Sequence, residues 1–129
     1  MKINPKIQLN LPKIKEVAEK AFQETMIDLG FSFTKVIVTP GFFPEYSGDI
    51  VDTGALKDSQ ELLLKGGLSV DFRWTVPYAS YVHEGYTHIS GKVMPGRPWT
   101  DYGLNLFDLS KQFAIHFGKE VKNNTTINF

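Results

Sequence analysis

The sequence contains no cysteine, no long apolar run and no excess of charge of either sign among its 129 residues. The lack of cysteine excludes disulfides and thiolate metal ligands. No apolar stretch approaches the roughly 18 residues of a membrane span, and we expect no signal peptide. Lys and Arg number 14, as do Asp and Glu, so the strongly basic composition of a general nucleic-acid binder is absent. We therefore expect a soluble globular domain, long enough to bury a core.

The neutral total conceals an uneven distribution of charge along the chain. Residues 1–43 carry six basic and four acidic groups, residues 44–90 carry three and seven, and residues 91–129 carry five and three. An acidic middle segment therefore lies between two mildly basic ends. It is either an ordinary solvated segment or part of a subunit that presents opposite charges to neighbouring copies.

Two segments have the apolar spacing of amphipathic helices. Between Pro12 and Leu29 apolar residues recur at intervals of three and four, which predicts a helix that begins near Pro12 and ends at Gly30. A second long helix is expected from Trp99 to about Gly118, again with aromatic and aliphatic residues along one side.

Three further segments are predicted to form strands. Residues 31–39 are rich in β-branched and aromatic residues and are followed by a Pro-Gly turn. Residues 59–64 and 68–75 flank Lys65-Gly66-Gly67, which is typical of a hairpin turn. Apolar and polar residues alternate in the last of these runs, which indicates a strand with one solvent-exposed face.

The order of these elements predicts an α+β fold. In it, the N-terminal and C-terminal helices pack on an antiparallel β-sheet of about three to five strands. A short helix is expected over residues 78–84, and long loops over residues 40–55 and 86–98. We expect the whole chain to be one domain, with an arm over residues 1–11 and a polar tail over residues 119–129.

The loop over residues 40–55 contains three aromatic residues, Phe42, Phe43 and Tyr46. Long loops in compact domains are often functional, and exposed aromatic side chains indicate a partner surface. The same residues could instead fold back over the edge of the sheet, and the sequence does not decide between the two.

The segment Asp52-Thr53-Gly54 follows two apolar residues, as in the active-site loop of retroviral-type aspartic proteases. In those enzymes one Asp from each of two protomers shares a proton, because adjacent carboxylates do not both ionise. That fold is all-β, whereas this chain has two long helical patterns and no glycine-rich flap. Asp-Thr-Gly is also ordinary turn chemistry. A protease remains an alternative on this evidence.

Three histidines are candidates for a metal site. His83 and His88 lie five residues apart with a glycine between them, whereas a zinc-protease helix needs its histidines four apart. His116 lies alone in the second helical pattern. We therefore expect no metal site.

Three segments, in order, carry a resemblance to a known group of proteins. They cover residues 51–59 (VDTGALKDS), 78–85 (YASYVHEG) and 96–99 (GRPW). Together they resemble the small neck and tail-completion proteins of tailed bacteriophages, which include minor capsid and head–tail joining proteins. The resemblance spans roughly residues 50–105 and implies an Asp-Thr-Gly turn that opens a strand and an Arg-Pro-aromatic step that starts the last helix.

The resemblance implies a structural, non-enzymatic virion protein. Such a protein assembles as a homo-oligomeric ring, with a hexamer favoured, and contacts neighbouring connector and tail-tube proteins while DNA passes without sequence-specific binding. It would be made in the host cytoplasm and reside in the neck or tail of the virion, without a membrane, cofactor or metal. Whether it would act in head closure, tail termination or tail completion stays open, as does a small adaptor module unrelated to virions.

The candidate interface residues lie in the aromatic loop and the three segments of the resemblance. Tyr78, Tyr81 and Val82 share one face of the short helix, which packs either in the core or in an interface. Arg97 is either solvated or paired with an acidic group of the middle segment. We further expect part of that segment to face the DNA channel and repel phosphate. The candidates are Phe42, Phe43, Tyr46, Asp52, Tyr81, His83, Tyr86, Arg97 and Trp99.

Overall fold

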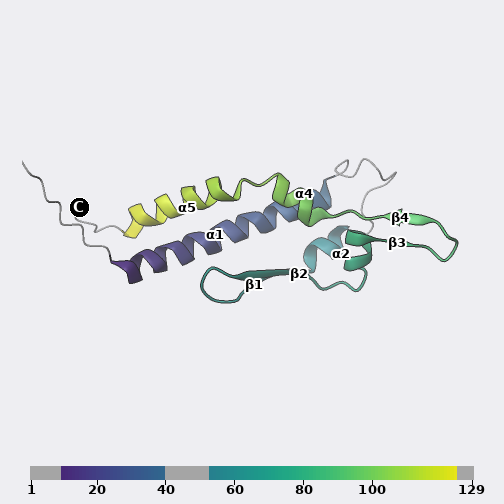
Figure 1. Ribbon diagram of the computed structural model, residues 1–129, viewed down its shortest axis with the longest axis horizontal. Coiled ribbons are helices and arrows are strands. Elements are labelled where there is room, and N and C mark those ends of the chain that lie inside the picture. Colours follow the sequence, from purple (N-terminus) through teal and green to yellow (C-terminus); the bar gives the residue numbers. More distant parts are fainter. Residues whose placement is uncertain (1–9, 40–52, 125–129) are drawn as a thin grey trace, which may run out of the picture.

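The computed structural model describes residues 10–39 and 53–124, and its mixture of helices and antiparallel strands confirms the expected α+β class. An elongated body is built on one long helix, with a second helix lying antiparallel to it and two hairpins beside and beyond it (Figure 1). The elements are α1 (Leu11–Val38), α2 (Thr53–Asp58), β1 (Gln60–Leu64), β2 (Val70–Trp74), α3 (Ala79–Glu84), β3 (Gly85–Thr87), β4 (Val93–Pro95), α4 (Trp99–Asn105) and α5 (Leu109–Asn124).

The first helix begins where it was predicted but continues eight residues past its predicted end. Asn10 caps α1 by accepting a hydrogen bond from the backbone N–H of Lys13 at 3.1 Å, and a proline occupies the first turn. The helix then passes through Gly30 and ends at Val38. The prediction of a strand over residues 31–39 is therefore wrong.

Tertiary packing explains why this β-prone segment is helical. Phe33, Val36 and Ile37 are buried and continue the helical spacing of the apolar residues before them. Burial of that face outweighs the modest helix propensity of β-branched residues. Gly30 does not break the helix, because its lack of a side chain admits Phe72 and lets Nε2 of Gln60 donate to its carbonyl at 2.9 Å.

The central hairpin confirms the alternation predicted from the sequence. Strands β1 and β2 pair antiparallel, and Gly66 and Gly67 form the turn with φ of +88° and +58°, a conformation that favours glycine. Val70, Phe72 and Trp74 face the core, while the residues between them are exposed.

The expected single sheet of three to five strands is not formed. The described residues make two separate sheets of two strands each, β1–β2 and β3–β4. Because residues 31–39 belong to α1, the central hairpin has no third strand. The second sheet lies within the predicted loop over residues 86–98 and projects from one end of the molecule (Figure 1).

Two other predicted elements differ from the structure. The helix expected from Trp99 to about Gly118 is two helices, because α4 ends at Asn105 and Asp108 caps α5 by accepting from the backbone N–H of Lys111 at 3.1 Å. Helix α5 then continues to Asn124, so residues 119–124 of the predicted tail are helical.

The segment after Asp52 is also not the turn implied by the resemblance. Residues Thr53–Asp58 form the short helix α2, and the strand begins only at Gln60. The helix places Leu56 in the core with no exposed surface, and the Ser59 hydroxyl donates to the Leu56 carbonyl at 2.8 Å to end it.

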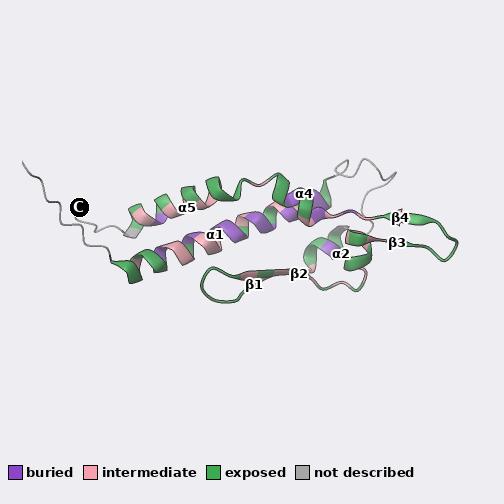
Figure 2. Cartoon of the chain, in the orientation of Figure 1, coloured by how far each residue is buried: buried purple, intermediate pink, exposed green. Residues whose placement is uncertain are grey.

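The core lies along the C-terminal half of α1, where buried residues gather (Figure 2). Leu56, Ala79 and Trp99 pack there, and each comes from a different one of the three sequence segments that carry the resemblance. Those segments therefore converge on one structural unit, held by burial of apolar surface. Aromatic rings complete the core: Trp74 meets Phe33 and Trp99 edge to face, with centroids 5.6 and 5.4 Å apart.

Within residues 10–39 and 53–124, no helix has both the length and the apolar composition to cross a membrane.

Helix α4 packs closely on α1 because Gly103 has no side chain. A Cβ at Gly103 would overlap the ring of Phe33, which is buried and has no room to move. We predict that Gly103→Ala destabilises the protein by about 1–3 kcal/mol through overpacking. Gly118→Ala in α5 is the matched control, since no atom lies within 4 Å of the added Cβ, and it should stabilise by up to about 1 kcal/mol. Urea unfolding of both variants measures this, and equal effects would contradict it.

Candidate interaction site

The second and third segments of the resemblance meet at the junction of α3, the β3–β4 hairpin and α4. Gly85 ends α3 with φ of +82°, and a Cβ there would lie 2.6 Å from the backbone N of Gly96. A Cβ on Gly96 would in turn lie 2.5 Å from the His83 carbonyl oxygen. The two chain segments therefore cross backbone against backbone, which only glycine permits. The backbone N–H of Arg97 donates to the Val82 carbonyl at 2.8 Å and closes the junction.

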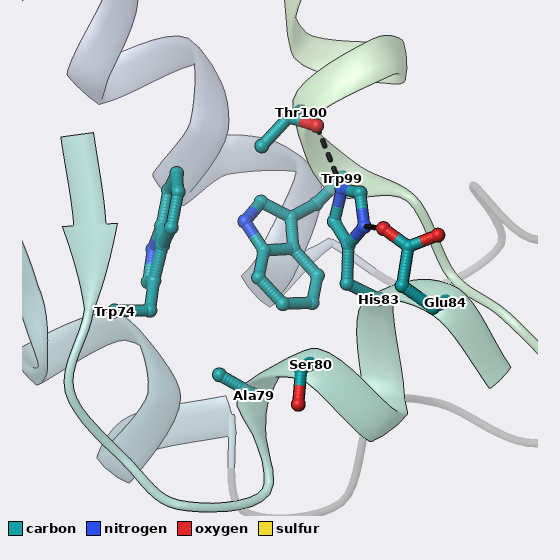
Figure 3. A pocket seen from close by; sticks show the side chains of 7 residues that line it. All are labelled: Trp74, Ala79, Ser80, His83, Glu84, Trp99 and Thr100. Atoms are coloured by element: carbon teal, nitrogen blue, oxygen red, sulfur yellow. Dashed lines mark hydrogen bonds and ion pairs between the residues drawn. The ribbon is translucent and has the colours of Figure 1, made fainter. Parts of the chain in front are cut away.

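A pocket of about 300 Å³ lies beside this junction. It opens between β2, α3 and the start of α4 (Figure 3). Two tryptophan rings give it apolar walls, and the exposed residues Ser80 and Glu84 lie at its rim. The lining residues are Trp74, Ala79, Ser80, His83, Glu84, Trp99 and Thr100.

His83 bridges two elements inside this pocket. Its Nδ1 lies 2.6 Å from Oε1 of Glu84 and its Nε2 lies 2.7 Å from Oγ1 of Thr100 (Figure 3). A neutral ring protonated on Nδ1 donates to the carboxylate and accepts from the hydroxyl, so both contacts are satisfied at once. The imidazole also meets the Trp99 ring edge to face, with centroids 4.7 Å apart. His83 thus joins α3 to the first turn of α4.

The indole of Trp99 forms the floor of the pocket. The residue is 1% exposed, and its Nε1 has no hydrogen-bond partner among the described residues. In Figure 3 this nitrogen points toward Trp74, whose plane lies at 74° to that of Trp99. The positive edge of one indole therefore faces the negative face of the other, which partly compensates the buried N–H.

The order hydroxyl, imidazole, carboxylate matches the connectivity of a hydrolase triad, with Thr100 in the place of the nucleophile. The carboxylate of Glu84, however, has 75% of its side chain exposed, so water screens its effect on the ring. Thr100 carries its hydroxyl in the first turn of α4, where the contact with His83 joins two helices. The geometry therefore fits a structural bridge beside a docking pocket better than a catalytic centre.

The structure brings several of the predicted interface residues together. Tyr81 and Tyr86 are 60% and 44% exposed, and their rings lie 6.1 Å apart on the outside of the junction. Tyr81 therefore points away from the core, whereas Val82 on the same helix packs against it. His83, by contrast, lines the pocket, with 19% of its side chain exposed.

Two of the predicted interface residues lie inside the molecule. Arg97 is 5% exposed and Trp99 is 1% exposed, so neither offers surface to a partner directly. Both residues belong to the junction instead. The backbone N–H of Arg97 donates to the Val82 carbonyl, and Trp99 starts α4 after Pro98, as the sequence predicted. Four other candidates lie outside the described residues: Phe42, Phe43, Tyr46 and Asp52.

Sequence reasoning missed Trp74, Ser80 and Thr100 as pocket residues. Trp74 was assigned to the buried face of a strand, which is correct, but one edge of its ring also lines the pocket. Thr100 follows Arg97-Pro98-Trp99, and nothing in the sequence indicated that its hydroxyl would contact a histidine. Only the approach of α3 to α4 places these side chains together.

The three histidines lie in three separate environments. His88 belongs to the β3–β4 turn, where its Nδ1 lies 2.9 Å from the Ser90 hydroxyl. His116 lies on α5 and faces α1. No three His, Cys, Asp or Glu side chains gather in a metal-binding arrangement anywhere in the described ranges.

A second polar cluster joins α5 to α1. His116 has its Nδ1 3.1 Å from Oε2 of Glu24 and its Nε2 2.5 Å from Oδ2 of Asp28. Lys20 lies 3.3 Å from Oε2 of Glu120, which is 3% exposed. Burial, followed by the hydrogen bond and charge of Glu120, raises the pKa of Glu24 above its ordinary value of 4.5, although His116 and Lys20 oppose this. These polar contacts add to the apolar packing of Phe22 near Leu109 and Phe113 between the two helices.

Comparison with known proteins adds no assignment, since no protein-family model, curated protein or solved structure matches the chain.

We predict that Thr100→Val destabilises the protein by about 1–3 kcal/mol, because it leaves Nε2 of the half-buried His83 without its partner. Thr100→Ser keeps the hydroxyl and serves as the matched control, with stability close to that of the original protein. Urea unfolding gives the stabilities, and NMR of the imidazole nitrogens reports the bridge. Equal stability of the valine and serine variants would show that the bridge contributes nothing.

The raised pKa of Glu24 predicts a pH dependence of stability. In the folded protein the Glu24 carboxyl stays protonated at pH values where the same group in the unfolded chain is ionised. Its contribution to the free energy of unfolding therefore falls as the pH rises above 4.5 through the raised pKa. Glu24→Gln should therefore lose less stability than the original protein between pH 4.5 and 7. Glu16→Gln removes an exposed carboxylate from the same helix and should keep the original pH dependence. Parallel curves for all three proteins would contradict the prediction.

Proposed function

We propose that this protein is a structural subunit of the neck of a tailed bacteriophage that assembles into a ring between head and tail. The proposal is supported by the resemblance of residues 51–59, 78–85 and 96–99 to neck and tail-completion proteins. It is also supported by the surface of the described residues, where exposed apolar side chains and open strand edges are available for contact with neighbouring subunits.

The observation that carries the proposal is the balance of buried and exposed apolar side chains. Ten hydrophobic residues are buried, whereas sixteen large hydrophobic residues are exposed in the described part of the chain. Single exposed apolar residues are normal in soluble proteins, whereas exposed apolar residues that gather on one face mark surfaces that partners cover. Three of them, Ile27, Phe31 and Val38, share the solvent-facing side of α1 at helical spacing.

Unpaired strand edges give a second argument. Each of the two sheets has only two strands, so in the described residues both outer edges of each hairpin lack a neighbouring strand. Two-stranded sheets are marginal alone, and open edges are templates for pairing with another chain. Such edges suit a protein whose stable form is an assembly.

The shape of the molecule supports a ring in particular. The β3–β4 hairpin projects from one end and the α1–α5 pair extends toward the other (Figure 1). Subunits that contact through different surfaces at their two ends form heterologous interfaces, which close into rings when the rotation between subunits permits. Within such a ring we expect part of the acidic segment over residues 44–90 to face the channel and keep DNA phosphates from binding.

The structure gives the two other functions considered from the sequence less support. Asp52 lies outside the described residues, and the residues after it form α2 rather than the active-site loop of an aspartic protease. An adaptor module unrelated to virions would share the exposed apolar surface. It differs in its oligomeric state, since it has no need to form a closed ring.

The purified protein is expected to form rings of one defined size as its concentration rises, visible by electron microscopy and by light scattering coupled to gel filtration. Rings held by apolar surface should persist at 1 M salt, where the Debye length is about 3 Å, while association through charges alone would dissociate. A protein that stays monomeric even when mixed with phage connector and tail-tube proteins would refute the proposal. A ring with a channel lined mainly by Lys and Arg would refute its account of DNA passage.

A further inference from the structure

The tip of the β3–β4 hairpin carries an apolar side chain at the position where turns usually carry polar ones. Ile89 is 99% exposed, the highest exposure among the large hydrophobic residues of the described chain. Turn positions favour Gly, Pro, Asn, Asp and Ser, so a β-branched apolar residue there gains nothing from the fold of its own chain. The whole side chain of Ile89 is therefore available for contact with a partner.

The turn holds this residue in a fixed position. The backbone N–H of His88 donates to the Lys92 carbonyl at 2.7 Å, and that of Gly91 donates to the His88 carbonyl at 2.8 Å. Gly91 has φ of +87°, as in a three-residue hairpin loop with a glycine bulge. The His88 ring also accepts from the backbone N–H of Ser90 at 3.1 Å. A turn with this many internal bonds loses little entropy when it binds.

The pocket beside Trp74 and Trp99 has the size and walls to accept this tip. Its volume is about 300 Å³, and an apolar cavity of about 150 Å³ already holds benzene, so an isoleucine side chain with part of its turn fits. Another pocket in the described residues lies between α1 and α5, measures about 210 Å³ and is lined by Phe22, Thr25, Leu109, Ser110 and Phe113.

Charge distinguishes the two pockets. Glu84 lines the first pocket and Asp101 follows its lining residue Thr100, and both are exposed. The five residues that line the second pocket are all uncharged. The hairpin carries Lys92 and no acidic residue between Gly85 and Thr100. A cationic tip therefore complements the acidic rim of the first pocket.

We propose that Ile89 of one copy inserts into the pocket beside Trp74 and Trp99 of the next copy, with Lys92 facing Glu84 at the rim. A copy does not fill its own pocket, because the pocket lies at the base of the hairpin and the tip projects away from it (Figure 1). The contact joins different surfaces of the two copies, as ring closure requires. The inference rests on the proposed function only in requiring that the chain assembles.

The cysteine-free sequence allows a direct test by disulfide cross-linking. Ile89→Cys and Ser80→Cys are made as separate single-cysteine proteins, mixed, assembled and oxidised. The mixture should give the mixed Ile89–Ser80 cross-link as its main product, since Ser80 lies at the rim of the pocket. Ile89→Cys mixed with Phe31→Cys is the matched control, because Phe31 is 68% exposed on a different helix. Equal cross-linking of the two mixtures overturns the proposal.

Charge reversal provides a second measurement on the intact protein. Lys92→Glu and Ile89→Glu should each weaken assembly by about tenfold or more, the effect expected for an interface anchor. Glu84→Lys combined with Lys92→Glu should restore assembly. Lys111→Glu, on α5, should leave it unchanged, and circular dichroism verifies that all variants fold. If rings form but neither hairpin variant weakens them, the hairpin contact is wrong and the proposed function stands. If no assembly forms under any condition, both are wrong.

Discussion

The fold depends on the burial of three side chains, Leu56, Ala79 and Trp99, against the C-terminal half of α1. Each belongs to a different segment of the chain, and nothing else in the described residues draws those segments together to the same extent. The hydrophobic effect stabilises this packing but is not directional. The edge-to-face contacts of Trp74 with Phe33 and Trp99 fix its geometry. The central hairpin packs against this centre, whereas α5 contacts α1 nearer its N-terminus, around Lys20 and Glu24.

The limited core has a consequence for function. In the described residues both sheets have open edges and many large apolar side chains are exposed, so apolar surface is left for other chains. A monomer that is only partly buried gains stability from assembly, since binding partners stabilise the folded state by mass action. This is the physical basis of the proposal that the chain is a subunit of an assembly.

Predictions from the sequence succeeded where a pattern was local. The alternation in β2, the glycine turn before it and the end of α3 at Gly85 were all predictable, because each depends on neighbouring residues alone. Residues 31–39 were assigned to a strand, because β-branched residues were weighed above the helical spacing of Phe33, Val36 and Ile37. The pocket was not predictable, since Trp74, His83 and Thr100 meet only through the packing of separate elements.

The sequence by itself determined the α+β class, the turns, the start of α1 and of α4 and the absence of disulfides, because propensity, capping and composition act over a few residues. Only the tertiary structure decided that α1 runs through Gly30 and that the sheet divides into two hairpins. It alone also made Trp99 a core residue with a pocket beside it, and left Ile89 exposed. Those outcomes depend on which apolar surfaces, distant in the sequence, pack together and are buried from water. That pairing is a property of the whole folded chain and not of any short segment.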